Sequence, residues 1–352
     1  MLNYLNISPD LESKEILKLT IKVSRELAEF KTEVKNFTSH DILFNLLNLI
    51  DAKFNLAIEN KETSFDNIYK EVVGFETLDR NAKFVIKILD SHRHGNYQLH
   101  INKLLTIGTF SGMQYILVNN KAGLRKVPGL RVRDKNGEVI YYPPKMYDEV
   151  YKYMLDFERL SNDSFITSLD PIVKQALLHS QFIAIQPFID SSNIMARMMT
   201  SLYFTKDELL SKSIFTISPY FYKNKKRYNK LIHNIKMNED SKEWILFYLQ
   251  GVLQSAIMGK KFLKELDILI RKQHNIIFQE TNFYSKKLRN CIIKYPFVTI
   301  NTIVENLGIH RQTSSSYLKK LCQLDILKLR KNGRNNFYEN IELMKLINEF
   351  HF

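Results

Sequence analysis

The segment HSQFIAIQPFIDSSNIMARMM, from His179 to Met199, is the most informative part of this chain. An apolar helical pattern ends at the Pro187-Phe188 step, a short polar loop follows, and a second helical pattern begins after it. Backbone N–H groups at the start of such a helix can hold an anion. Arg197, one turn into that helix, could reach a phosphate. Taken alone, the pattern is more typical of an ordinary helix–loop–helix turn than of a binding site.

The composition is that of a folded, basic protein. The 352 residues are 45% hydrophobic, and this length suggests two or three domains at about 100–200 residues each. Only 11 Gly and 8 Pro are present, which argues against a turn-rich all-β protein and against a Gly-rich dinucleotide fold. The net charge of +14 favours a polyanionic partner, although an AT-rich genome would also raise the lysine content without any function.

The cysteines and the apolar segments exclude several classes of protein. The two cysteines, Cys291 and Cys322, form no CxxC or Cys/His cluster, so neither a disulfide scaffold nor a structural zinc site is expected. The N-terminus meets acidic residues before any apolar run, unlike a signal peptide. No segment approaches the roughly 18 apolar residues of a membrane span. We therefore expect a cytoplasmic protein with no membrane partner.

Helical periodicity dominates the chain and predicts a mainly α fold. The expected helices cover 11–34, 41–58, 77–92, 100–110, 145–160, 172–185, 193–204, 220–236, 241–278, 299–306 and 311–324. Asp170-Pro171 is a typical helix start. Two β-hairpins are expected, over 123–142 with Asn136-Gly137 at its turn, and over 326–338. We expect no other regular strands.

Residues 186–197 resemble the active-site loop of the Fic family (Fic/DOC, the protein AMPylators), H-P-F-x-[DE]-G-N-G-R-x-x-R. The matching positions are Pro187, Phe188, Asp190 and Arg197. The hairpin at 123–144 lies where Fic proteins carry a flap over their target. The resemblance extends from about Leu43 to Ala256 and implies a Fic-like helical bundle with a β-hairpin flap.

The resemblance also implies a chemistry. Fic proteins transfer AMP from ATP to a hydroxyl of a target protein, with the loop histidine as general base. By this likeness ATP and Mg²⁺ are the cofactors, and Asp190 faces the metal. The implied nucleotide contacts are Ser191, Ser192, Asn193 and Arg197.

The loop departs from the family pattern at the positions that carry the chemistry. Gln186 replaces the histidine, and an amide cannot take a proton near neutral pH. Ser191-Ser192-Asn193 replace the G-N-G segment. Glycines let the backbone come close to phosphates, and serine side chains restrict this approach. Ile194 replaces the first arginine. These changes favour a pseudoenzyme that has lost AMP transfer. A different chemistry that uses His179 stays open. However, His179 lies two helical turns before the loop, which favours a packed structural residue.

A helix upstream resembles the inhibitory motif of the family, [ST]-x-x-x-E-[GN]. Here Asn55 departs from Ser/Thr, whereas Glu59 and Asn60 match. In family members this glutamate pairs with the second loop arginine and blocks the ATP γ-phosphate. The resemblance therefore implies an inhibitory Glu59 that pairs with Arg197; alternatively, Glu59 is an ordinary solvated helix residue.

The last 68 residues carry a disproportionate share of the positive charge. Residues 285–352 contain 12 Lys and Arg against 5 Asp and Glu, half of the excess in a fifth of the chain. Helix, a turn with Gly308, helix and hairpin is the order of a winged helix-turn-helix. Such a domain binds DNA or docks on a protein, and the charge favours DNA. The expected DNA contacts are Arg311, Gln312, Thr313, Ser315, Lys319, Lys320, Lys331 and Arg334.

These observations divide the chain into four parts. They are an N-terminal helical region at 1–98 with the inhibitory-type helix at about 41–60, a Fic-like core at 99–260, a linker helix at 261–284 and the winged helix-turn-helix at 285–352. Three functions remain open: an adenylyltransferase regulated by Glu59, an inactive Fic scaffold acting as a DNA-binding regulator, and a nucleotide- or peptide-responsive scaffold. The last two are compatible. The sequence leaves open whether the chain forms a homodimer.

Overall fold

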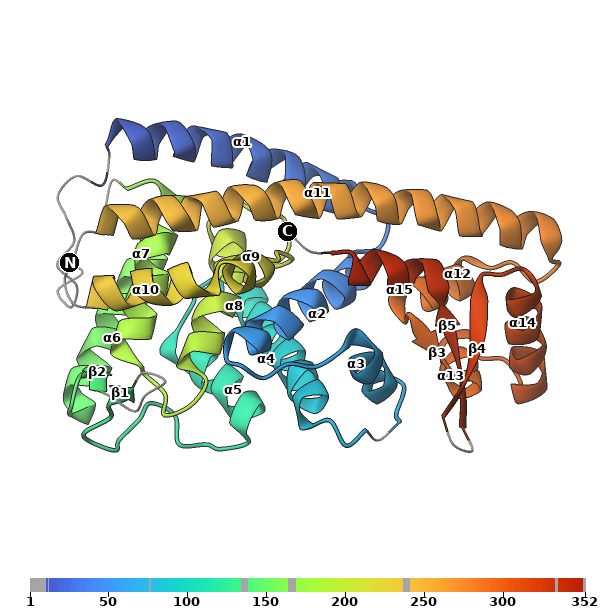
Figure 1. Cartoon of the computed structure of the whole chain (residues 1–352), viewed down its shortest axis with the longest axis horizontal. Coiled ribbons are helices and arrows are strands. Elements are labelled where there is room, and N and C mark those ends of the chain that lie inside the picture. The colour runs from blue at the N-terminus through green and yellow to red at the C-terminus, as the bar shows by residue number, and fades with distance from the viewer. Residues whose placement is uncertain are drawn as a thin grey trace.

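The structure is a computed structural model that describes residues 11, 13–75, 77–133, 139–163, 169–236, 241–332 and 335–350. Over these residues the chain forms fifteen helices and five short strands, so the predicted mainly α class is confirmed. The molecule is elongated, with a helical core at one end and a smaller C-terminal group at the other (Figure 1). Within the described ranges no helix is long and apolar enough to cross a membrane.

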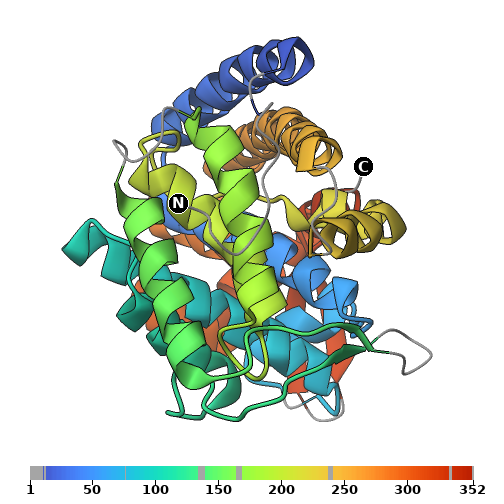
Figure 2. The same cartoon turned by 90° about the vertical axis from the view of Figure 1, so that its left-hand side faces the viewer.

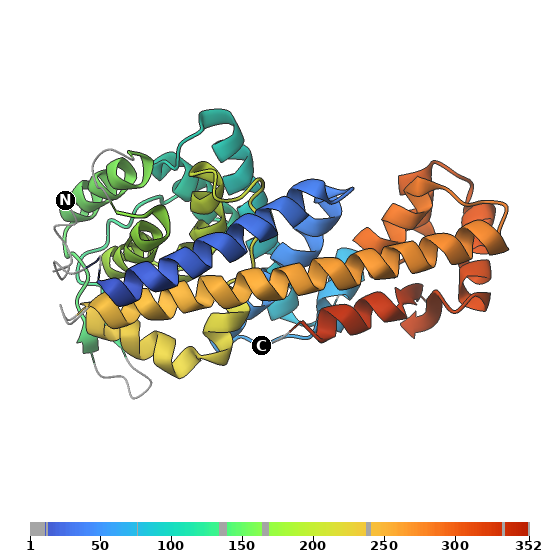
Figure 3. The same ribbon diagram turned by 90° about the horizontal axis from the view of Figure 1, so that it is seen from above.

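Two long helices run side by side along the molecule, α1 (Lys14–Asn36) and α11 (Ser241–Glu280) (Figure 3). The buried residues of α1 recur every three or four positions, which gives the helix one apolar face against α11. The helices touch closely where the ring of Phe30 lies over Gly259. A Cβ at Gly259 would lie 2.6 Å from that ring, so only glycine fits there without movement.

The core surrounds two buried helices, α7 (Pro171–Ile185) and α8 (Ser192–Lys206), which carry the loop at 186–191 between them. Every residue of α7 from Ile172 to Ile185 is buried. Figure 2 faces this end of the molecule and shows α6 (Tyr147–Asn162) beside α7. Around this pair lie α2 (His40–Ile58), α4 (Arg80–Asn102), α5 (Ile107–Val118), α9 (Ser218–Lys223) and α10 (Lys225–Lys236).

Three helix predictions are wrong at their boundaries. The helix expected over 77–92 continues to Asn102 as α4. The helix expected over 100–110 does not exist as one element, because α4 ends where Lys103 turns left-handed (φ 59°), and α5 begins after Thr106, whose side chain caps the N–H of Thr109. The helix expected over 220–236 is interrupted at Asn224, so that α9 and α10 are separate. Left-handed lysine and an internal asparagine give no strong sequence signal, since neither residue is a strong helix breaker.

Both expected hairpins are present. In the flap, β1 (Val132–Arg133) pairs antiparallel with β2 (Val139–Tyr141), and its turn at Asn136-Gly137 lies outside the described residues. The second hairpin joins β4 (Leu327–Asn332) and β5 (Asn335–Asn340). The expectation of no further strand is wrong, because β3 (Phe297–Val298) pairs with β5 and makes a sheet of order β3-β5-β4. A two-residue strand is too short to show an alternating pattern.

The C-terminal group consists of this sheet with α12 (Lys286–Lys294), α13 (Ile300–Leu307), α14 (Arg311–Gln323) and α15 (Ile341–Asn348). Gly308 ends α13 with φ 70°, as the sequence predicts. The helices α12 and α15, and α3 (Phe65–Val72) in the core, were not expected from the sequence.

The C-terminal group packs on the core through α2, α3 and the loop after α3. The ring centroids of Tyr69 and Phe297 are 6.0 Å apart, and those of Phe75 and Phe337 are 5.6 Å apart. Lys294 Nζ lies 2.5 Å from Asp41 Oδ2 in the first turn of α2. The group is therefore fixed to the same helix that carries Asn55.

A buried carboxyl joins α2 to α9. Asp51 accepts hydrogen bonds from the Ser218 backbone N–H (2.8 Å) and from the Ser218 hydroxyl (3.0 Å). Burial raises the pKa of Asp51 to about 7, because desolvation outweighs these hydrogen bonds and the nearby Arg197 charge. The folded state therefore binds a proton that the unfolded chain releases near pH 4, and stability decreases as pH rises from about 4 to about 7.

We expect Asp51→Asn to be more stable than the wild type at pH 8 by about 2–4 kcal/mol, since the amide removes the cost of ionising a buried carboxyl. Below pH 4 the two proteins should differ by less than about 1 kcal/mol, because Asp51 is protonated in both states and an amide oxygen can still accept from the Ser218 N–H. Urea unfolding at the two pH values measures both differences. Equal pH profiles for the two proteins would contradict the raised pKa.

Candidate functional site

The loop between α7 and α8 turns sharply at both of its ends. Gln186 ends α7 in the left-handed region (φ 48°), and Ser191 precedes α8 in the same region (φ 76°). Between them Phe188 is fully buried and anchors the loop. Left-handed conformations cost a side-chain-bearing residue about 1–2 kcal/mol each. Contacts within the loop must therefore hold it in this shape.

Gln186 supplies one such contact. Its Nε2 donates to Ile183 O and to Asn193 Oδ1, both at 2.9 Å. The amide thus faces the first turn of α8 as a hydrogen-bond donor. A side chain in this role ties the two helices together and offers no basic nitrogen to a substrate hydroxyl.

The two loop serines bond to the loop itself. The Ser192 hydroxyl donates to Phe188 O (3.0 Å) and accepts from the Phe188 N–H (3.1 Å). The Ser191 hydroxyl donates to Asp190 O and lies 3.7 Å from the Met195 sulfur. Both hydroxyls are therefore engaged by neighbouring protein atoms.

Asp190 is exposed at the tip of this loop. The described part of the chain contains no cluster of three or more His, Cys, Asp or Glu side chains that could hold a metal ion. Mg²⁺ is usually held by one or two carboxylates together with phosphate oxygens and water. Asp190 therefore fits a magnesium ion only as a single ligand beside a bound nucleotide.

Arg197 makes three side-chain hydrogen bonds, and its side chain is only 1% exposed. Its Nε donates to Asn55 Oδ1 (2.7 Å), and its Nη2 donates to Glu59 Oε1 (2.5 Å) and Asn55 O (3.3 Å). Burial lowers the pKa of the guanidinium, but Glu59 and Tyr228 raise it further, so the net pKa is raised. The predicted Glu59–Arg197 ion pair is confirmed.

The side-chain amide of Asn55 joins α2 to α8 through both its oxygen and its nitrogen. Besides accepting from Arg197, its Nδ2 donates to Ile194 O at 3.0 Å. This residue stands where the inhibitory motif has Ser or Thr, and an amide can donate and accept in different directions at once. The departure from the motif thus has a structural role that the sequence does not reveal.

Family models match two parts of the chain. Residues 101–204 match the Fic/DOC family. The chain thus contains a Fic/DOC-family segment. Residues 269–343 match the C-terminal domain of SoFic-like protein adenylyltransferases. The Fic match contains the flap and the loop, and the second match contains α13, α14 and the hairpin β4–β5.

Solved structures of Fic proteins share the fold. A Fic family protein from Desulfovibrio desulfuricans G20 superposes with a TM-score of 0.58 at 16% identity, covering 93% of this chain and 96% of its own. A Fic domain containing signaling protein from Bacteroides thetaiotaomicron superposes with a TM-score of 0.52 at 14% identity, covering 71% of this chain and 95% of its own. Fic-1 from C. elegans superposes with a TM-score of 0.54 at 15% identity, covering 71% of this chain and 74% of its own. At these identities the likeness concerns the fold alone.

In this Fic fold, His179 is a packed residue of α7. It is fully buried, its Nε2 lies 2.9 Å from the Tyr228 hydroxyl, and Phe221, Trp244 and Tyr248 surround its ring. Burial, together with the Arg197 charge, lowers the pKa of His179 to about 3. The imidazole therefore stays neutral and has no exposed face for a substrate.

Arg125 is a site residue that the sequence analysis missed. Its Nε donates to Gln186 O (2.6 Å), and its Nη2 donates to Pro144 O (2.6 Å) and Ile185 O (3.2 Å). Its own N–H donates to Pro187 O at 2.9 Å. The side chain is buried and fastens the flap segment to the Fic loop. Carbonyl acceptors carry no residue-type signature, so the sequence gives no signal for these contacts.

The predicted DNA contacts lie mostly on one side of α14. Arg311, Gln312 and Lys319 are exposed, and Thr313, Ser315 and Lys320 are half-buried. The opposite side is buried, with the Ser314 hydroxyl donating to Ile300 O of α13 at 3.0 Å. Lys331 is exposed on β4, and Arg334 lies outside the described residues.

We expect the Glu59–Arg197 pair to show strong coupling in a double-mutant cycle. Glu59→Gln should destabilise the wild type by about 2 kcal/mol, because it leaves a buried guanidinium without its counter-charge. The same change in an Arg197→Met background should cost less than about 0.5 kcal/mol, since Glu59 is then a partly exposed carboxylate. Denaturant unfolding of the four proteins gives the coupling energy, and a value near zero would contradict a structural ion pair.

Proposed function

We propose that this Fic-family chain is a DNA-binding regulator whose core no longer transfers AMP. The observation that carries this proposal is the Gln186 amide, which takes the place of the family's base and donates its hydrogen bonds to Asn193 and Ile183. AMP transfer requires a group that removes the proton of the target hydroxyl. An amide in this position cannot accept that proton.

The rest of the loop supports the loss of phosphate binding. The hydroxyl of Ser192 is hydrogen-bonded to the backbone of Phe188, and the side chain of Ile194 is apolar. The guanidinium of Arg197 is bonded to Asn55 and Glu59. A nucleotide would have to displace bonds of a buried guanidinium to gain a phosphate contact. Because such an exchange returns little net free energy, tight ATP binding is not expected. A weak, nucleotide-responsive core is compatible with the same contacts.

We expect no transfer of label from α-labelled ATP to the chain itself or to proteins of a cell extract. Glu59→Gly, which frees Arg197, should not change this. Gln186→His alone should also fail, although a general base contributes about 10²–10⁴-fold to such a reaction, because Ile194 and the serines still replace the phosphate contacts. The measurement is autoradiography after electrophoresis, with folding of each variant checked by thermal unfolding. Label transfer by the wild type would favour an active adenylyltransferase restrained by Glu59.

The C-terminal group supports the DNA-binding half of the proposal. The order α13, Gly308 turn, α14 and hairpin β4–β5 is that of a winged helix-turn-helix, in which α14 would be the recognition helix. Its exposed side carries cations and amides, which bind phosphates and base edges. The net charge of +7 over residues 285–352 attracts a duplex without regard to sequence.

We expect the full chain to bind duplex DNA with an affinity that falls steeply with salt. Lys331→Gln should weaken binding to all sequences alike and flatten the plot of log K against log salt by about one unit, the value for one phosphate contact. Arg311→Ala should instead reduce discrimination between sites by about 1–3 kcal/mol if its guanidinium reads a base. Fluorescence anisotropy over a salt series measures both effects.

The control is Lys264→Gln, an exposed lysine of α11 outside the C-terminal group. It should leave the slope unchanged. Absence of binding to any duplex at low salt would remove DNA from the proposal and leave a protein-docking winged helix.

A further inference from the structure

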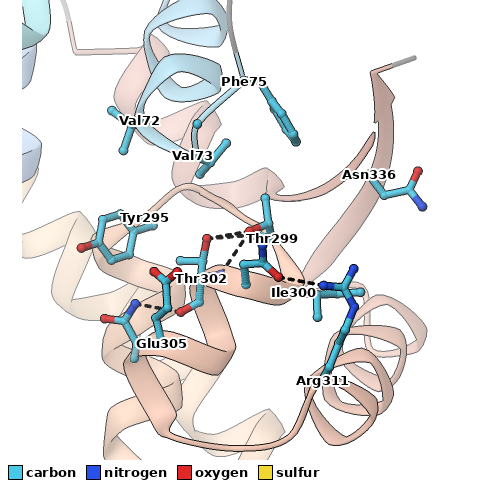
Figure 4. A pocket seen from close by; sticks show the side chains of 13 residues that line it. Val72, Val73, Phe75, Tyr295, Thr299, Ile300, Thr302, Glu305, Arg311 and Asn336 are labelled. Carbon is cyan, nitrogen blue, oxygen red and sulfur yellow. Dashed lines mark hydrogen bonds between the residues drawn. The ribbon is translucent and has the colours of Figure 1, made fainter. Parts of the chain in front are cut away.

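A cavity of about 680 Å³ opens between the core and the C-terminal group. Figure 4 shows its two walls: Val72, Val73 and Phe75 at the end of α3 on one side, and the first turn of α13 with Thr299 and Thr302 on the other. Cavities between packed units of a protein are frequent binding sites, and this volume is within the usual range of about 300–1,000 Å³.

The C-terminal wall is rich in hydrogen-bonding side chains. Asn301 accepts from Arg311 Nη1 at 3.0 Å, and the Asn306 amide donates to Thr302 O at 2.8 Å. Asn301, Asn306 and Arg311 are all exposed. Threonine, asparagine and arginine are among the side chains that contact the sugar and phosphate of DNA. The chemistry of this wall therefore suits a nucleic-acid backbone.

The cavity is continuous with the face of the C-terminal group to which we assign DNA binding. Arg311, at the start of α14, belongs to both. Asn336, which also lines the cavity, pairs with Lys331 across the β4–β5 ladder. A duplex contacted by α14 and by Lys331 would thus lie next to the cavity and to the end of α3.

We propose that this cavity receives the sugar–phosphate backbone of the duplex that α14 contacts, so that the end of α3 in the core forms part of the DNA-binding surface. The inference rests on the proposed DNA-binding function and deepens it. The core would then take part in DNA binding directly, through Val73 and its neighbours.

Charges placed on the core wall provide the sharpest test, because their two signs must act in opposite directions. Val73 is half-buried at the C-cap of α3 and belongs to the core. Val73→Lys should tighten binding of the full chain to a random-sequence duplex by about fivefold at low salt, and Val73→Glu should weaken it by about fivefold, the effect of one unit charge about 4 Å from another in water. A merely structural role of Val73 would not give opposite signs.

The matched control is the pair Val127→Lys and Val127→Glu. Val127 is an exposed valine just before β1, which Figure 1 shows at the opposite end of the molecule from α14. Charges there lie beyond the screening length of about 8–10 Å. Both variants should bind the duplex as the wild type does.

A second pair tests the C-terminal wall. Asn306 and Asn348 are both exposed, and each amide donates to the carbonyl four residues earlier at 2.8 Å, but only Asn306 lines the cavity. Asn306→Asp should weaken binding about fivefold, whereas Asn348→Asp should not. Glu305, an acidic residue on this wall, should repel the backbone, so Glu305→Gln should tighten binding by a similar factor.

The outcomes separate this inference from the proposed function. If the wild type binds and Lys331→Gln weakens it, but the Val73 pair and Asn306→Asp have no effect, the cavity is not a backbone site and DNA binding stands. If the wild type binds no duplex at low salt, both proposals fail. Equal shifts of the same sign for Val73→Lys and Val73→Glu would also overturn the cavity site.

Discussion

The buried guanidinium of Arg197 is the constraint on which the core depends. A charge removed from water costs several kcal/mol unless it is paired and hydrogen-bonded. Here Asn55 and Glu59 of α2 supply the acceptors, and Tyr228 of α10 lies beneath the planar group with its ring centroid 6.0 Å away. Because the planar fork of arginine fixes where its acceptors must lie, these bonds hold α2 in place against α8.

The helix α2 connects the Arg197 site to the C-terminal group. α2 has 19 residues and is therefore roughly 28 Å long, with Asp41 in its first turn and Glu59 at its end. The Asp41–Lys294 ion pair is largely exposed on the aspartate side and contributes about 1 kcal/mol at most. The ring contacts of Tyr69 and Phe75 with Phe297 and Phe337 bury more apolar area and contribute more. Apolar packing thus fixes the C-terminal group to the core.

Local signals in the sequence located most of the fold. The Asp170-Pro171 start, the Pro187-Phe188 step and the Gly308 turn each act on the backbone next to them, so the residue type alone reveals the structure. Partners that are distant in sequence were found only where a family motif existed, as for Glu59. Arg125 had no such motif, because its acceptors are backbone carbonyls that any residue provides. The strand β3 was missed for a similar reason, since its two residues pair through backbone groups.

The loop at 186–193 illustrates how substitutions can be mutually consistent. Ser191 stands at a motif position that is glycine in the family pattern, and it is left-handed here at a cost of about 1–2 kcal/mol. The bonds from Gln186 to Asn193 and between Ser192 and Phe188 contribute about 1 kcal/mol each and offset that cost. Each of these bonds uses a side chain that differs from the family pattern. The loop therefore holds its shape through bonds that its own polar side chains make with one another and with the backbone of Phe188.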